Sequence, residues 1–261
     1  SNVLFAAPNG GHAPPFTSWK NAATNINDAV NWALDGCTVL VSNGHYRLPY
    51  EVQVTKDIDL RGAAGAQHTI LDGRGGVRCI LIENNGALID GLTVSNGWGG
   101  WGGGGLYYGA RGTVQNCRIL DCGGDYYGGG VYMHQPGTLR YCTLAHNHSA
   151  TYGSAFHAEN GGTVMNCEIV DNDGYMRAVN HRASLTLRNC LIARNHSRTI
   201  AIVGGYQAGA LNMENCTVVD NTIDLAAAAS GGAAAVMANS GTLRNNIIRY
   251  NMFNGVESNT M

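Results

Sequence analysis

The sequence predicts an all-β solenoid, a parallel β-helix, and two observations support that class. Glycine supplies 37 of the 261 residues and charged residues only 13%, which indicates short strands joined by tight turns. A cysteine also returns at intervals of 25, 25, 23 and 26 residues. A repeat of this length is typical of a solenoid in which each repeat stacks on its neighbours. The cysteine column consists of Cys117, Cys142, Cys167, Cys190 and Cys216.

Apolar residues recur at three fixed offsets from the cysteine column. Short apolar alternations separated by Gly and Asn predict about three strands per repeat. Between residues 37 and 251 this pattern predicts about eight to nine coils, with the column continuing to Gly91 on one side and Asn246 on the other. The offset of minus three gives Val114, Leu139, Val164, Leu187, Met213 and Leu243, plus two gives Ile119, Leu144, Ile169, Ile192, Val218 and Ile248, and minus eleven gives Leu106, Val131, Phe156 and Val179.

A column of asparagines lies five residues after the cysteine column, and Cys122 interrupts it. Asn tolerates a left-handed backbone and bonds to nearby main chain, so we expect a bend at this column. Amides stacked once per coil are also expected to bond to one another, as an asparagine ladder. The members are Asn96, Asn147, Asn172, Asn195, Asn221 and Asn251.

The N-terminal part of the chain differs from the repeats. Residues 24–35 carry apolar side chains at helical spacing, with Thr24 as the expected N-cap and Gly36 as the expected stop. We expect this helix to cover the open end of the first coil. We treat residues 1–261 as one domain, with a tail at 252–261 and no recognisable cap after Asn251. The expected buried face of the helix is Ile26, Ala29, Val30, Ala33 and Leu34.

Two stretches carry a family resemblance. "AATNINDAVNWALDGCTVLVSNGHYRL" (22–48) followed by "VTKDIDLRGAAGAQHTILDG" (54–73) resembles the opening of the pectate-lyase-like right-handed β-helix superfamily. The glycine-rich corners with "NCxIxxN" resemble repeats of polymorphic outer-membrane-type surface proteins. The resemblance covers roughly residues 21–251 and implies a right-handed coil and an extracellular or bacterial cell-surface location. It carries no catalytic residue over, because neither an acidic calcium cluster nor an aspartate-rich signature is present.

The cysteine column has four conceivable roles: disulfides, a metal site, a nucleophile, or packing. Coils lie about 4.8 Å apart, but parallel side chains do not offer the torsion of a disulfide. A linear column does not converge on a metal, and a nucleophile is expected to be single and partly exposed. We therefore predict a ladder of inward-facing free thiols. Cys122 and Cys142 remain an alternative disulfide pair, and Cys37 and Cys79 are expected in the core.

The columns at minus ten and minus eight are expected to face outward, because side chains alternate along a strand. On the central coils these positions hold aromatic, imidazole, carboxylate and guanidinium groups. Aromatic rings stack on pyranose rings, and the charged groups bond to hydroxyls or carboxylates. The alternative interpretation is an ordinary solvated ladder of opposite charges. The residues are Tyr107, Tyr132, His134, His157, Glu159, Asn180 and Arg182.

The chemistry of this face favours elimination over hydrolysis. A two-carboxylate glycosidase needs carboxyls about 5–9.5 Å apart, whereas Glu83 and Glu159 stand three coils apart, about 14 Å. For elimination we expect Arg182 to neutralise a uronate carboxylate, and His157 or His134 to act as base. Tyr132 would deliver or share the proton. Expected substrate contacts are Tyr107, Glu159 and Asn180, with Trp98 and Trp101 as a stacking wall.

Composition bears on the possible partners. The net charge of −2 gives no bulk attraction to nucleic acid, and no segment approaches the ~20 apolar residues of a membrane span. No basic-then-apolar leader opens the sequence. We expect no cofactor and no metal; calcium at "DNDGY" (171–175) is the alternative.

Two functions of different classes remain. The first is an extracellular carbohydrate-active protein that binds an acidic polysaccharide and cleaves it by β-elimination, as a lyase rather than a hydrolase. The second is a non-catalytic adhesin, passenger or glycan-binding module, for which the regular coils are a spacer. The sequence leaves open whether the protein is an enzyme.

Overall fold

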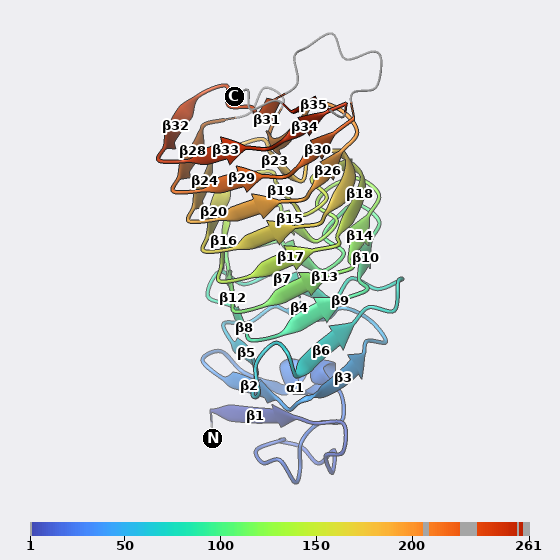
Figure 1. The fold of residues 1–261 in the computed structure, drawn as a ribbon. Coiled ribbons are helices and arrows are strands. Elements are labelled where there is room, and N and C mark those ends of the chain that lie inside the picture. Colours follow the sequence, from blue (N-terminus) through green and yellow to red (C-terminus); the bar gives the residue numbers. More distant parts are fainter. Residues whose placement is uncertain (1, 206–208, 225–233, 255, 258–261) are drawn as a thin grey trace.

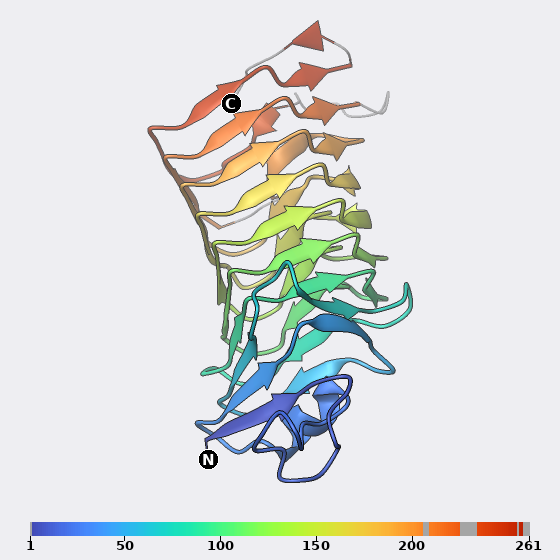
Figure 2. The same ribbon diagram turned by 60° about the horizontal axis from the view of Figure 1, so that its bottom comes forward.

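The computed structural model describes residues 2–205, 209–224, 234–254 and 256–257, and these form a solenoid of stacked strands (Figure 1). Four sheets run along the solenoid axis, and every described strand pair is parallel except β34 with β35. Figure 2 shows the successive turns lying one above another from the N-terminal end to the C-terminal end. The predicted all-β parallel class is confirmed.

The described strands belong to four sheets, which we call A to D. Sheet A contains β1 (Val3–Ala6), β2 (Thr38–Val41), β5 (Asp59–Gly62), β8 (Leu88–Asp90), β12 (Thr113–Gln115), β16 (Gly137–Arg140), β20 (Gly162–Met165), β24 (Leu185–Arg188), β28 (Leu211–Glu214) and β32 (Gly241–Arg244). Sheet B contains β3 (Gly44–Arg47), β6 (Thr69–Asp72), β9 (Thr93–Ser95), β13 (Arg118–Leu120), β17 (Thr143–Ala145), β21 (Glu168–Val170), β25 (Leu191–Ala193), β29 (Thr217–Val219) and β33 (Ile247–Arg249).

The remaining strands complete each turn. Sheet C contains β4 (Val52–Val54), β7 (Ile80–Ile82), β11 (Leu106–Tyr108), β15 (Val131–Met133), β19 (Phe156–Ala158), β23 (Val179–His181), β27 (Ala201–Gly204) and β31 (Ala234–Val236). Sheet D contains β10 (Trp98–Gly99), β14 (Gly123–Gly124), β18 (His148–Tyr152), β22 (Asp173–Met176), β26 (His196–Ser197), β30 (Thr222–Ile223), β34 (Met252–Phe253) and β35 (Val256–Glu257).

Sheets A, B and C are the three strands expected per repeat, and sheet D is additional. Its first two strands are only two residues long and largely glycine, so they carry no alternation that a sequence pattern could reveal. From β8 to β31, six successive turns place a strand in all four sheets. Counting sheets A, B and C alone, eight turns of the described chain from β2 to β31 carry all three strands, which is close to the eight to nine coils expected. Strands β34 and β35 lie in the expected tail, of which residues 255 and 258–261 are outside the described residues.

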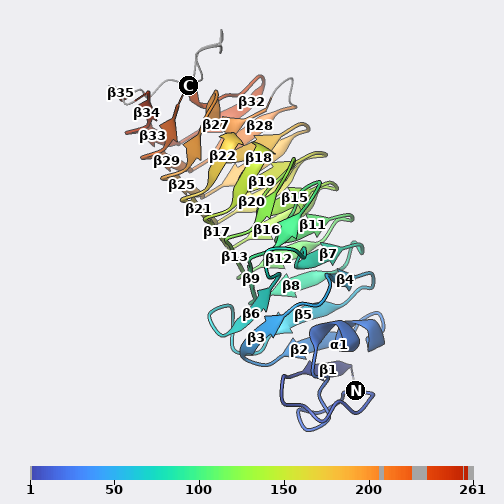
Figure 3. The same cartoon turned by 90° about the vertical axis from the view of Figure 1, so that its right-hand side faces the viewer.

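The N-terminal helix α1 (Ile26–Trp32) is shorter than the expected 24–35. Its N-cap is Asn25, whose side chain accepts a hydrogen bond from the Asp28 amide, so the assignment of Thr24 was wrong. The apolar face is buried as expected except for Leu34, which is 72% exposed beyond the helix end. Figure 3 shows α1 beside β1 and β2 at the N-terminal end. Strand β1, which the sequence pattern did not predict, adds a further strand to sheet A.

Two corners of each turn use a left-handed backbone. One is the residue before the cysteine column, and the other is the residue four places after it. The asparagine column is one residue further on, so its members are not themselves the left-handed residues. The first corner comprises Asn116, Tyr141, Asn166, Asn189, Asn215 and Asn245, and the second Asp121, His146, Asp171, Arg194, Asp220 and Tyr250, all with φ between 52° and 57°.

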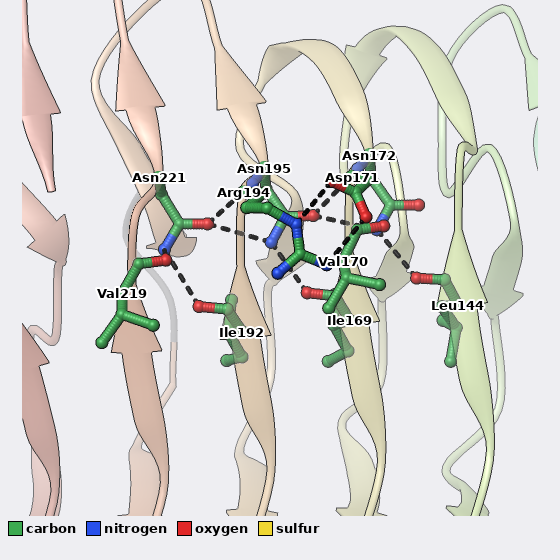
Figure 4. A network of polar contacts seen from close by, with 10 residues as sticks. All are labelled: Leu144, Ile169, Val170, Asp171, Asn172, Ile192, Arg194, Asn195, Val219 and Asn221. Atoms are coloured by element: carbon green, nitrogen blue, oxygen red, sulfur yellow. Dashed lines mark hydrogen bonds and ion pairs between the residues drawn. The ribbon is translucent and has the colours of Figure 1, made fainter. Parts of the chain in front are cut away.

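The asparagine column points inward and forms a continuous ladder (Figure 4). Asn147, Asn172, Asn195, Asn221 and Asn251 are linked from Nδ2 to the next Oδ1 at 2.9–3.0 Å. Each Nδ2 also donates to a main-chain carbonyl of the preceding turn, such as Leu144 in the case of Asn172. A buried amide without a hydrogen-bond partner would lower the stability of the fold by about 1–3 kcal/mol. Stacking identical amides avoids this cost, because each amide bonds to the next.

Asn96 lies outside the ladder, contrary to expectation. Ser95 pairs with Leu120, so Gly97 is the neighbour of Cys122 and Leu92, rather than Gly91, continues the cysteine column. The expected register was one residue out at this turn. Asn96 is instead an exposed left-handed corner residue with φ of 50°.

The interior is lined by the three apolar columns and the cysteines. The column members are buried except in the last turn, where Leu243 is 37% exposed and Ile248 is half-buried. All eight cysteines are free, so Cys122 and Cys142 are not bridged, and Cys37 is half-buried. Each thiol of the column donates to the carbonyl two residues before it at 3.0–3.5 Å. Burial raises the pKa of the Cys142 thiol, whereas a hydrogen bond with Cys190 lowers that of Cys216 to about 7, so it is the burial of the whole column that indicates packing.

Candidate functional site

The expected face is the outer surface of sheet C. Strand pairing places Tyr107 beside Tyr132, Tyr132 beside His157, and His157 beside Asn180. His134, Glu159 and Arg182 each follow two residues later, on three successive turns. The register predicted from the cysteine column therefore brings these residues together.

The degree of exposure differs from the expectation. The face was expected to be open to solvent, yet Tyr132, His157 and Asn180 are 7%, 1% and 3% exposed. Two rings from the part of each turn before sheet C lie against them, Tyr127 from a connection and Tyr152 from the end of β18. The Tyr127 ring is centred 4.8 Å from the His157 imidazole and 5.4 Å from the Tyr132 ring, and the Tyr152 ring stacks on Tyr127 at 5.6 Å.

Tyr127 and Tyr152 were missed by sequence reasoning. A signal for them exists, because they sit 25 residues apart in the same repeat frame and form an isolated parallel bridge. The glycine-rich corner in which they lie was interpreted as a turn. Its side chains were therefore not assigned to any column.

A chain of hydrogen bonds runs through the buried part of the face. Arg177 donates to Asn180 Oδ1 at 3.1 Å, so the Asn180 amide nitrogen faces His157 Nδ1, at 2.6 Å. His157 Nδ1 is therefore the acceptor, and its Nε2 carries the hydrogen that is donated to Glu159 Oε2 at 2.9 Å. The other oxygen of Glu159 accepts from Arg182 at 2.6 Å.

His157 is thus a neutral imidazole with both nitrogens engaged. Burial lowers its pKa to about 4, although the neighbouring Glu159 carboxylate raises it in part. The expected role of His157 as a base does not fit this position, because no ring nitrogen faces solvent.

Arg177 begins the chain and is buried, at 1% exposure. Its Nε and Nη2 have no hydrogen-bond partner among the described residues, and burial lowers its pKa. It also has a left-handed backbone, with φ of 52°. No sequence pattern pointed to this residue, because it replaces the glycines and serine of the earlier turns at a corner.

The accessible part of the face centres on His134. Its Nδ1 lies 3.3 Å from the Tyr132 hydroxyl, and the Tyr107 ring stacks on its imidazole at 6.1 Å. The Arg78 guanidinium lies over the Tyr107 ring at 4.7 Å. Burial, reinforced by the Glu159 carboxylate, raises the pKa of Tyr132, so its hydroxyl stays protonated. Arg182, with a side chain 65% exposed, projects beside Glu159.

The two expected tryptophans are separated. Trp101 is 70% exposed and stacks on Tyr126 at 5.1 Å, which connects it through Tyr127 to the face. Trp98 lies over Gly123 and lines a groove at the corner between sheets B and D. They do not form one stacking wall.

The aspartates of the alternative calcium site are engaged in ion pairs. Asp171 pairs with Arg194 at 2.9 Å, and Asp173 pairs with His196 and Arg198 at 2.8 and 2.7 Å. Among the described residues, no group of three or more His, Cys, Asp or Glu side chains is arranged to hold a metal. In the same part of the chain, no helix has the length and apolarity to span a bilayer.

Comparison with known proteins establishes the family. The chain belongs to the family described as right handed beta helix region, whose model matches residues 67–192 and 138–260. A comparison with curated protein sequences finds no match. The right-handed β-helix implied by the sequence resemblance is thereby confirmed.

Two solved structures share the fold. The crystal structure of pectate lyase Pel9A superposes with a TM-score of 0.66 and 14% identity, covering 94% of this chain and 79% of that one. The pectin methylesterase from Aspergillus niger gives a TM-score of 0.52 and 13% identity, covering 98% and 86%. At such identities the similarity concerns the architecture alone.

Proposed function

We propose that the outer face of sheet C binds an acidic polysaccharide outside the cell and cleaves it by β-elimination. The observation that supports this most is the exposed Arg182 guanidinium, anchored on Glu159 and two turns beyond the accessible imidazole of His134 and its aromatic neighbours. The pectin-related names of two structures with this fold agree with a polysaccharide ligand.

The proposed elimination distributes roles over three side chains. Arg182 binds the uronate carboxylate and withdraws charge from the adjacent carbon, which acidifies its proton. His134 Nε2 removes that proton, the bond to the glycosidic oxygen breaks, and a carbon–carbon double bond forms. The imidazolium or water returns a proton to the leaving oxygen. Tyr132 acts through His134 by accepting from Nδ1, which leaves the lone pair of Nε2 free.

The spacing suits a pyranose ring. Coils lie about 4.8 Å apart, so the backbones of His134 and Arg182, two coils distant, stand about 10 Å apart. The imidazole of His134 and the long side chain of Arg182 both extend from these backbones, so the gap between their functional groups approaches the size of one sugar ring. His157 and Asn180 then hold Glu159, and through it Arg182, in place.

A binding-only function is the second candidate, and one observation favours it. Both oxygens of Glu159 and both ring nitrogens of His157 are already bonded within the protein. A network so closed suits a rigid recognition surface. In that case Tyr107, His134 and Arg182 would bind glycan without chemistry, as in an adhesin.

Incubation with a panel of uronate polymers separates these functions. We expect ultraviolet absorbance from unsaturated ends, with His134→Ala lowering the rate 10²–10⁴-fold and Arg182→Ala lowering it at least tenfold. Arg188→Ala, an exposed arginine of sheet A paired with Glu214, is the matched control. Absence of product from every polymer, with binding retained, would replace the lyase by the adhesin.

A further inference from the structure

A groove of about 580 Å³ lies at the corner between sheets B and D, away from the outer face of sheet C. Its size is within the usual range for ligand sites. The side chains that matter for its chemistry are Arg47, Arg74, Trp98, Asp121, His146 and His148.

We propose that this corner groove is a second carbohydrate site, which binds an extended chain of acidic sugars. It is independent of the proposed lyase face, and neither requires the other. A second site would hold a long polymer on the solenoid whether or not the polymer is cleaved.

The length of the groove indicates a chain rather than a single ion. In sheet B, Arg47 pairs with Asp72 of the next strand. The residues paired at the same position in the following three strands are Ser95, Leu120 and Ala145. The lining residues therefore come from five consecutive turns, which span about 19 Å along the axis. A monosaccharide or inorganic anion would occupy only a fraction of that length.

The charge of the lining favours an acidic ligand. Arg47 and Arg74 have no carboxylate partner among the described residues, although the whole chain carries a net charge of −2. Burial raises the pKa of Asp72, which is 7% exposed, but hydrogen bonds from the Arg74 main-chain N–H at 2.8 Å, Asn96 at 3.2 Å and His45 at 2.8 Å lower it overall.

Of the charged groups in the lining, the guanidinium groups rather than Asp72 lack a partner among the described residues. Asp121 is exposed at a left-handed corner and is the second carboxylate of the lining. Against it stand two unpaired guanidinium groups and the imidazoles of His146 and His148. A carboxylate-bearing sugar chain therefore meets two unpaired guanidinium groups, whereas Asp72 is already bonded within the protein and Asp121 is the one carboxylate of the described lining left open.

Trp98 supplies the surface for the sugar ring. Its indole, 39% exposed, lies over Gly123, where an added Cβ would come within 2.4 Å of a ring carbon. Glycine at this position leaves the room that the partly exposed indole occupies against the backbone. An aromatic face packs against the CH groups of a pyranose ring.

Titration with a galacturonate hexamer, followed by NMR at the Trp98 indole N–H, tests the proposal. The protein used carries Arg182→Ala. This substitution weakens binding of the hexamer at sheet C, so that the titration reports binding in the groove. We expect a saturable shift of this resonance, assigned through Trp98→Phe. We expect Arg47→Gln with Arg74→Gln to weaken binding at least tenfold, whereas the exposed Arg118→Gln leaves it unchanged.

Two ligand controls and one variant control decide the outcome. A neutral glucose hexamer and inorganic sulfate are each expected to bind at least tenfold more weakly than the galacturonate hexamer. Trp101→Ala, which removes an exposed indole outside the groove, is expected to bind normally. Equal affinity for sulfate and hexamer, or unchanged affinity in the double arginine variant, would overturn the proposal. Failure of cleavage at sheet C would not affect it.

Discussion

Two polar columns run along the same turns of this solenoid, and they differ in composition. The asparagine ladder repeats one residue type, faces inward, and closes each amide on the next. The outer face of sheet C instead changes its residue type along the axis, from two tyrosines to an imidazole to an amide. Uniform stacking satisfies buried groups and stabilises the coil, whereas varied stacking creates one specific local environment.

The largest expected effect concerns the ladder. Asn172→Ala removes the partner of Asn147 and leaves buried amide and carbonyl groups unpaired, which should lower the free energy of unfolding by about 3 kcal/mol. Chemical denaturation measures this change. Asn212→Ala, whose side chain bonds at an exposed position on sheet A, is the control and should cost less than about 1 kcal/mol. Equal losses would remove the distinction between the two kinds of column.

The next effect concerns pH and His157. Its pKa in the folded protein is about 4, below the ordinary value of 6.5, so between these values the unfolded chain binds a proton that the folded chain does not. The free energy of unfolding should therefore fall as pH drops from 6.5 to 4, by at most roughly 3 kcal/mol from this group. Denaturation of wild type and His157→Gln at both pH values measures the difference. A slope that persists in the variant would assign it to other groups.

A smaller effect is expected from opening the aromatic cover. Tyr127→Ala removes the ring centred 4.8 Å from His157 and admits water, which should raise the pKa of His157 by about one unit. NMR titration of the imidazole follows the change. Tyr126→Ala, which removes a neighbouring exposed ring, is the matched control. An unaltered His157 pKa would show that the backbone, rather than Tyr127, excludes solvent.

The smallest effect belongs to the cysteine column. Cys167→Ala deletes one small buried thiol and should lower the free energy of unfolding by about 1 kcal/mol. Because all eight cysteines are free, a reducing agent should leave the melting temperature of wild type unchanged. A drop in that temperature on reduction would contradict the ladder of free thiols.

The regular part of the fold could be predicted, and the corners could not. Apolar residues at offsets minus eleven, minus three and plus two identified sheets A, B and C, because burial repeats at every turn. Sheet D escaped because strands such as Gly123–Gly124 have no side chains to alternate. The register failed by one residue at Asn96, because Leu92 and Gly97 occupy the positions of the cysteine and asparagine columns in this turn.

The site was predicted in composition but not in environment. Counting from the cysteine column correctly placed His134, His157, Glu159 and Arg182 on neighbouring turns of one face. It did not show that His157 is covered and bonded through both nitrogens, because the covering rings and Arg177 come from a corner of variable length. The separation of Trp98 from Trp101 depends on the same corner.

The sequence by itself therefore determined the solenoid, its period, the inward columns and the residues that share a face. These follow from side-chain alternation and hydrophobic burial, which are properties of local sequence repeated at a fixed interval. Only the tertiary structure decided which polar groups of that face remain accessible and which unpaired charges line a groove. Those properties depend on how corner side chains fold over adjacent turns, and a corner of glycines and single substitutions leaves no periodic trace.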